Sequence, residues 1–171
     1  MRVAVNISAA QLTGAGLART VLGALAASRL QPSQLELEVT ESVFLGDDAA
    51  TLASLERLRS LGVRLVLDDF GKGYSSFGYL SRAHFSKIKI DQSFVRGAAD
   101  GAQDCVAIVH AILALSQGLG VETTAEGVET EEQAAVMRNL GCTQLQGFYF
   151  GRPEPASEIS KEFADLSLRT A

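Results

Sequence analysis

The chain has 171 residues, which is the size of one ordinary domain. Hydrophobic residues make up 47% of it and charged residues 20%, a globular mixture that excludes disorder over most of the chain. Acidic residues outnumber basic ones 20 to 15, so the basic surplus typical of a protein that binds a nucleic-acid duplex is absent. An acidic chain still binds a phosphate ligand when a metal ion supplies the positive charge.

We expect neither an export signal nor a membrane-spanning segment in this sequence. The N-terminal residues MRVAVNISAAQ lack a long apolar core, and no stretch of about 18 apolar residues occurs. Cys105 and Cys142 are too few for a disulfide scaffold, and we expect them to be buried free thiols. These features predict a cytoplasmic α/β protein without a membrane segment.

Short apolar or β-branched runs recur along the whole chain and predict its strands. They are Val3–Ile7, Leu35–Thr40, Arg64–Asp69, Ser86–Asp91, Val121–Glu126 and Gln144–Phe148. The gaps between their starts are long enough for a strand followed by a crossover helix.

Helical spacing of apolar residues fills the gaps between these runs. The expected helices are, in chain order, Ala15–Arg29, one with Leu52, Leu55 and Leu58 on its apolar face, one with Val106, Val109, Ile112 and Leu113, one that opens with a Thr130–Gln133 capping box, and Ser157–Leu168. We expect Asp47 or Asp48 to cap the second helix and Gly62 to end it. Gly118 or Gly120 should end the third helix.

Alternating strands and helices predict a parallel sheet with right-handed crossovers. The sheet is then either open and doubly wound or closed into a barrel. No G-x-G-x-x-G pattern follows the first strand, so a dinucleotide-binding fold has no local support. A complete eight-stranded barrel needs about 250 residues, so the length favours an open sheet or a barrel that lacks about two units.

Polar side chains occur at or near the C-terminal end of every predicted strand, where ligands and catalytic groups collect in βα architectures. They are Asn6, Glu38, Asp68, Asp69, Lys89, Asp91, Glu126 and Gln146. Carboxylates that meet at one mouth repel one another, and a divalent cation removes that repulsion. Oxygen ligands without His or Cys indicate Mg²⁺ or Mn²⁺, with Ca²⁺ as an alternative.

The adjacent Asp68 and Asp69 can reach the same ions only if Asp69 lies past the strand end, because neighbours in a strand point to opposite faces. Gly71 and Gly73 would free the backbone there. The Gly71-Lys72-Gly73 sequence lacks the spacing of a phosphate-binding loop.

The fourth strand places Lys87, Lys89 and Asp91 on one face, while Ile88 and Ile90 share the other. A lysine aimed into a cavity lined by carboxylates is a charge partner or a catalytic group.

Some of these candidate site residues also have simpler structural interpretations, which remain open. Glu36 and Glu38 would also fit one solvated face of an edge strand, and Asp68–Asp69 would fit a turn. His84 and His110 are expected at structural or surface positions, because neither has a recognisable ligand partner.

Ordered motifs along nearly the whole chain, from about Val3 to Pro155, resemble the EAL family of bacterial phosphodiesterases that act on cyclic di-GMP. These motifs are NISAAQL, ELEVTES, LDDFGKGYSSFGYL, KIKID-x-SFV, TTAEGVET-x-x-Q and QLQGFYFGRP. The resemblance implies a modified TIM barrel that binds two Mg²⁺ or Mn²⁺ ions and hydrolyses cyclic di-GMP to linear pGpG. We therefore expect residues 1–171 to form a single domain, an incomplete TIM-like (β/α) barrel of about six parallel strands with helices outside.

The resemblance also implies a metal-ligand set in this chain. Asn6 and Glu38 would bind metal, Asp68 would bridge the two ions, Asp69 would bind the second ion, and Glu126 would bind it directly or through water. The chemistry implied is in-line attack by metal-activated water.

Further roles follow from the same motifs. Lys89 would contact the attacking water or the phosphate, and Asp91 would anchor that water or its metal. Gln146 would touch metal-bound water or phosphate. Glu41 would hold the loop Asp69–Ser76, which includes Gly71 and Gly73, with Glu129 in support.

Two departures from the family pattern bear on activity. The Glu-Ala-Leu motif precedes the Asn6 strand in the family, whereas this chain begins at that strand, so one glutamate ligand of the first ion and two strands are absent from it. Lys72 stands where the family usually has threonine. We therefore expect impaired hydrolysis, and homodimerisation or other self-association through exposed sheet edges. The alternatives are a non-catalytic module that binds cyclic di-GMP or regulates a partner, and a different metal-dependent enzyme on an open sheet.

Overall fold

The computed structural model describes residues 2–14, 16–45, 48–72 and 77–159. The strands are β1 (Val3–Asn6), β2 (Leu35–Thr40), β3 (Arg64–Phe70), β4 (Lys87–Ile90), β5 (Glu122–Ala125) and β6 (Gln144–Leu145). The helices are α1 (Ala9–Thr13), α2 (Leu17–Ser28), α3 (Asp48–Arg59), α4 (Leu80–Ala83), α5 (Gln92–Ala99), α6 (Gln103–Leu119) and α7 (Glu131–Leu140). Short 3₁₀ turns lie at Pro32–Gln34, Glu41–Phe44 and Phe77–Tyr79.

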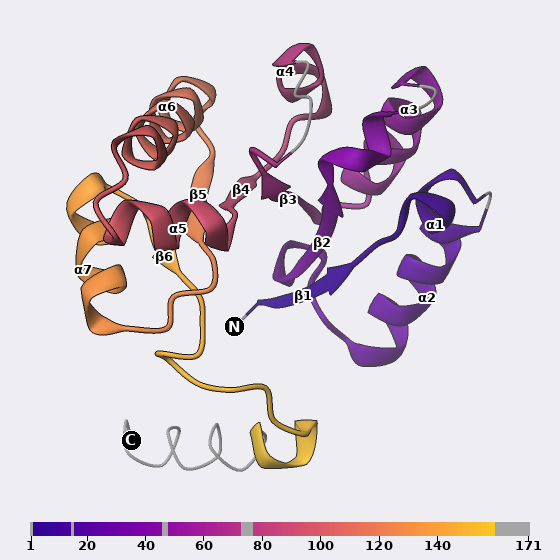
Figure 1. Ribbon diagram of the computed structural model, residues 1–171. Coiled ribbons are helices and arrows are strands. Elements are labelled where there is room, and N and C mark those ends of the chain that lie inside the picture. The colour runs from indigo at the N-terminus through magenta and orange to yellow at the C-terminus, as the bar shows by residue number, and fades with distance from the viewer. Residues whose placement is uncertain (1, 15, 46–47, 73–76, 160–171) are drawn as a thin grey trace.

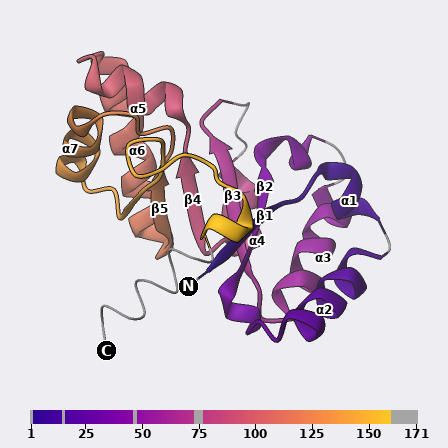
Figure 2. The ribbon, with the colours of Figure 1, turned by 90° about the horizontal axis from the view of Figure 1, so that it is seen from below.

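The strands form one parallel sheet in the order β1-β2-β3-β4-β5-β6, as the alternation of strands and helices predicts. The sheet is curled. Its curvature brings Arg2, beside β1, close to Glu122 at the start of β5, with the Arg2 Nη1 atom 3.1 Å from the carboxylate. The helices lie outside the curl, with α1 to α3 on one side and α5 to α7 on the other (Figures 1 and 2). The fold is thus a TIM-like half-barrel, as expected.

The two faces of the sheet differ in character. On one face, apolar side chains such as Leu37, Leu65 and Ile88 are almost fully buried in a common core that also contains Leu55 and Val109 of the covering helices. The alternation of side chains along each strand sends the intervening charged residues to the concave face. Burial on both faces is usual for a parallel sheet, but here the inner face is ionic rather than apolar.

Local signals mark the ends of the helices, and the predicted capping box of α7 is present. Thr130 Oγ1 accepts a hydrogen bond from the Gln133 amide, and α7 is followed by Gly141 with a φ of +99°. Gly120, with a φ of +68°, follows α6, so it rather than Gly118 ends that helix. The short helices α1, α4 and α5 are not among the predicted elements, because each has too few turns to show an apolar period.

Several predicted boundaries shift. The sixth run pairs only over Gln144–Leu145, since the chain turns sharply at Gly147. Of the helix expected at Ser157–Leu168, residues up to 159 are helical and the rest lies outside the described residues, as does Asp47. Cys105 and Cys142 are free thiols, but they are half-buried rather than buried.

A search of the described part of the chain finds no helix that is both long enough and apolar enough to cross a lipid bilayer.

Candidate functional site

A buried lysine lies among three carboxylates on the concave face. The Nζ atom of Lys89 is 2.7 Å from Oε1 of Glu126, 2.9 Å from Oε2 of Glu38 and 3.1 Å from Oδ1 of Asp68. These residues come from β4, the end of β5, β2 and β3, and we call them the inner cluster. The sequence predicts that these side chains meet, and the structure brings them together.

Strand alternation explains how the inner cluster forms. Glu36 and Glu38 lie two residues apart on β2, as Lys87 and Lys89 do on β4, so each pair shares the concave face. Both glutamates are buried, and β2 lies inside the sheet between β1 and β3. The interpretation of Glu36 and Glu38 as a solvated face of an edge strand is therefore wrong.

A second group, the outer cluster, surrounds Lys72. Its Nζ atom is 2.7 Å from Oδ2 of Asp91 and 3.2 Å from Oδ1 of Asp69. Asp91 also caps the N-terminus of α5, where its Oδ1 atom accepts a hydrogen bond from the Ser93 amide at 2.9 Å. The side chain of Asp91 is buried, whereas Lys72 and Asp69 are about half exposed. The outer cluster is therefore open to solvent on the lysine side.

An irregularity in β3 assigns the two neighbouring aspartates to different clusters. The pairing of β3 with β4 shifts register between Leu67 and Phe70, and Asp69 has a φ of +54°. The Asp69 amide donates to Oδ1 of Asp68 at 3.0 Å. Asp69 thus lies within β3 at a bulge rather than past the strand end. The interpretation of Asp68–Asp69 as a turn is therefore wrong.

Burial and charge pairing act in opposite directions on the pKa values of the inner cluster. Burial raises the pKa of Glu126 to about 7, against the opposing effect of Lys89 and with a further contribution from Asp68. Burial favours the neutral amine of Lys89, but hydrogen bonds to Glu126 and Glu38 outweigh it and raise the lysine pKa. The lysine therefore stays charged at neutral pH, while Glu126 lies near its titration midpoint.

The outer cluster has the opposite character. Burial works to raise the pKa of Asp91, but hydrogen bonds from Lys72 and Ser93 prevail and lower it to about 2. The pKa of Lys72 is raised, chiefly by its hydrogen bond to Asp91. Both partners are charged at neutral pH.

The other predicted residues are placed less centrally. Oε1 of Glu41 accepts a hydrogen bond from the Gly71 amide at 2.9 Å, so Glu41 contacts the first part of the predicted loop. Glu129 is exposed, and its nearest ion-pair partner is Arg96 at 3.9 Å. Gly73 lies outside the described residues.

Asn6 and Gln146 occupy strand ends without joining either cluster. Both are exposed, at the ends of β1 and β6 respectively. Asn6 is the register partner of Glu38, and the Gln146 amide donates to the Ala125 carbonyl at 2.9 Å. Among the described contacts, neither side chain touches the inner cluster.

A second ionic layer, which sequence reasoning did not predict, lies at the opposite ends of the same strands. Glu36 accepts from Lys87 at 2.7 Å and from Arg64 at 3.1 Å, and Arg64 also contacts Glu122 at 2.9 Å. We call these residues, with Arg2, the lower network. The i, i+2 spacing of charges in LELEVT and KIKID was the available signal, because it places two charges of each strand on one face.

The carboxylates suit a hard divalent cation. Within the described ranges, no three His, Cys, Asp or Glu side chains are arranged around one common ion position. However, three carboxylates of the inner cluster already surround one cationic group, and all their donor atoms are oxygen. This donor set is the one that Mg²⁺ and Mn²⁺ prefer, so the residues fit such an ion.

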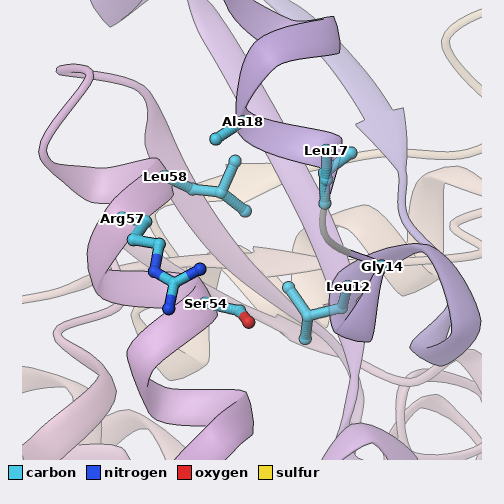
Figure 3. A pocket seen from close by; sticks show the side chains of 7 residues that line it. All are labelled: Leu12, Gly14, Leu17, Ala18, Ser54, Arg57 and Leu58. Atoms are coloured by element: carbon cyan, nitrogen blue, oxygen red, sulfur yellow. The ribbon is translucent and has the colours of Figure 1, made fainter.

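The small pocket in Figure 3 lies apart from these clusters, between α1, α2 and α3. Its lining is Leu12, Gly14, Leu17, Ala18, Ser54, Arg57 and Leu58. Its volume of about 30 Å³ suits a water molecule rather than a nucleotide. This pocket is therefore too small for the nucleotide site.

Comparison with known proteins places this arrangement in a family. A family model for the EAL domain matches residues 1–153. The chain is 48% identical, over 157 residues, to the bifunctional diguanylate cyclase/cyclic di-GMP phosphodiesterase MucR of Pseudomonas aeruginosa. That match covers 92% of this chain but 23% of MucR, so the chain spans about a quarter of its relative's length.

Solved structures agree with the sequence match. The PaMucR phosphodiesterase in complex with c-di-GMP superposes with a TM-score of 0.86 at 48% identity, covering 92% of this chain and 64% of that one. Klebsiella pneumoniae BlrP1, in a complex with manganese and cy-diGMP, gives a TM-score of 0.81 at 34% identity, covering 89% of this chain and 39% of that one. The parallel half-barrel, its ionic concave face and the match over most of the chain lead to one conclusion: this chain belongs to the EAL domain family.

Proposed function

We propose that this chain hydrolyses one phosphodiester bond of cyclic di-GMP to give linear pGpG. The observation that carries the proposal is the inner cluster, in which three carboxylates and a charged lysine meet at the C-terminal edge of a parallel sheet. That edge is where βα folds place their catalytic groups. MucR, a relative by sequence and structure, is a cyclic di-GMP phosphodiesterase by name.

Divalent ions would be held by the carboxylates at this edge. Glu38, Asp68 and Glu126 supply oxygen donors from the inner cluster and Asp69 supplies one from the outer cluster, with Asn6 beside Glu38 on the neighbouring strand. When bound, Mg²⁺ or Mn²⁺ lowers the pKa of a water molecule and neutralises charge on the phosphoryl oxygens. The manganese complex of BlrP1 supports this choice of ion.

The chain's own residues would orient the reacting groups and act on the attacking water. The ammonium of Lys89, held by three carboxylates, would place a fixed positive charge beside the reacting phosphate and its attacking water. Glu126, which contacts Lys89 at 2.7 Å, would act on the water from its place beside the ion. Asp91 would act more indirectly, because its oxygens are taken by Ser93 and Lys72.

Residues at the rim would complete the substrate site. Glu41 holds the Gly71 amide and so supports the backbone that follows Asp69. Gln146 is exposed beyond the end of β6, where it would be available to a phosphate or to a metal-bound water. Glu129 would support this rim only indirectly, through the start of α7.

The test is the appearance of pGpG when the purified chain is incubated with cyclic di-GMP and Mn²⁺, followed by chromatography. Glu38→Ala should lower the rate by at least about 10–100-fold, since loss of a group that merely supports a metal ligand already costs that much. Glu56→Ala is the matched control, because Glu56 is an exposed α3 residue paired with Arg59 outside both clusters.

A second candidate function is binding of cyclic di-GMP without hydrolysis. The observation in its favour is that lysine ammonium groups occupy both carboxylate clusters. Calorimetry separates the two candidates. Binding without pGpG supports the binding module, whereas neither binding nor product contradicts both functions.

A further inference from the structure

Lys72 and Lys89 differ in how firmly they are held. Lys89 is 3% exposed and lies in the interior of the sheet, so its departure would leave three carboxylates without their cation. The side chain of Lys72 is 50% exposed and follows β3, and it reaches its partners from the solvent side. A lysine on a flexible, exposed stem can reach water, and the cost of its departure falls on the buried Asp91, which keeps its hydrogen bonds from Ser93.

The ammonium of Lys72 occupies one oxygen of Asp69, a carboxylate that would hold a divalent ion in the proposed function. It contacts Oδ1 of Asp69 at 3.2 Å and Oδ2 of Asp91 at 2.7 Å, while the other oxygen of Asp91 is bonded to Ser93. Asp69 has no other ion-pair partner among the described residues. Any ion at Asp69 therefore meets a positive charge already in place.

We propose that Lys72 is an internal counter-cation that competes with a divalent ion for Asp69, and that its side chain swings into solvent when the ion binds. The inference rests on the proposed function in one respect, namely that Asp69 holds an ion. The chain then carries a fixed cation at the inner cluster and a displaceable one at the outer cluster. The ion nearest Asp69 binds more weakly than the carboxylates alone would allow.

The test is calorimetric titration of Mn²⁺ into the metal-free chain without nucleotide, which does not depend on activity. Lys72→Met removes the charge and keeps the length of the side chain. We expect it to tighten the weaker Mn²⁺ association about three- to tenfold, the effect of removing one nearby unit charge and one part-exposed ion pair. Lys72→Arg keeps the charge and should leave the affinity within about twofold of the original.

Two further variants test whether the tighter Mn²⁺ binding of Lys72→Met depends on Asp69. Lys72→Met combined with Asp69→Asn should show no gain over Asp69→Asn alone, because the carboxylate for which the lysine and the ion compete is gone. Arg59→Gln removes an exposed, ion-paired cation on α3 and should change nothing.

The possible failures are distinguishable. Mn²⁺ binding that is unchanged or weakened by Lys72→Met overturns the role of Lys72 but leaves the proposed function standing. Absence of Mn²⁺ binding at millimolar concentration in both the original chain and Lys72→Met contradicts the metal site itself and, with it, this inference.

Discussion

At the scale of single residues, Lys89 is the group on which the candidate site depends. One ammonium lies within 3.1 Å of three carboxylates and is itself almost fully buried. Buried charges are tolerated only when paired, so removal of this one cation leaves three anions facing one another. The same arrangement raises the pKa of Glu126, because that carboxyl is buried beside Asp68.

We therefore expect Lys89→Met to lower the free energy of unfolding by about 3–5 kcal/mol, the usual cost of removing one partner of a buried ion pair. Urea denaturation followed by circular dichroism measures it. Adding Mn²⁺ should recover part of the loss, since a bound cation stabilises the folded state. Lys72→Met, at a half-exposed position, is the control, and an equal cost in the two variants would show that burial of Lys89 is not what matters.

At the scale of elements, close backbone packing positions the segment after β6. The Val128 amide donates to the Gln146 carbonyl, and the Val128 carbonyl accepts from the Tyr149 amide, both at 3.0 Å. A Cβ atom on Gly147 would collide with the backbone nitrogen and oxygen of Val128. Glycine at this position therefore lets the end of β6 lie against the segment that follows Glu126.

Gly147→Ala should lower the free energy of unfolding by about 1–3 kcal/mol, because backbone atoms cannot move aside as a side chain can. Thermal unfolding measures the change. Gly151→Ala is the matched control in the same segment, since nothing lies within 4 Å of its added Cβ. Equal melting temperatures for the two variants would mean that the segment adapts and that the close approach is not required.

At the scale of the whole molecule, the curled sheet has two edges. Within the described residues, β1 pairs only with β2 and β6 only with β5. Val3 and Val5 of β1 are 37% and 43% exposed. The lower network stabilises the curvature of the sheet on its concave face, because Arg2, next to β1, forms an ion pair with Glu122 of β5.

We expect the chain to self-associate through the β1 edge, since an unpaired apolar strand is a template for another strand. Sedimentation velocity over a range of protein concentrations should show a rising average mass. Val5→Lys should shift the association to higher concentration, because a charge on an edge strand opposes pairing. Leu22→Lys, an exposed apolar position on α2, serves as the control. A stable monomer at high concentration would contradict the expectation.

Local patterns in the sequence were sufficient to predict much of the architecture and part of the site. The six strands follow from their apolar runs, and the α7 capping box follows from the Thr130–Gln133 spacing. The meeting of Glu38, Asp68, Lys89 and Glu126 follows from the polar strand ends. These are properties of segments a few residues long, and parallel strands necessarily align their C-terminal ends.

The tertiary structure alone decided which charges pair. The register shift in β3 separates Asp68 from Asp69, the capping of α5 by Asp91 brings that carboxylate to Lys72, and the curl brings Arg2 to Glu122. Each of these contacts depends on the relative placement of segments distant along the chain or on a local backbone irregularity. Composition and periodicity indicate which face a side chain occupies, but the partner across the sheet is set by register and curvature, which depend on the packing of the whole chain.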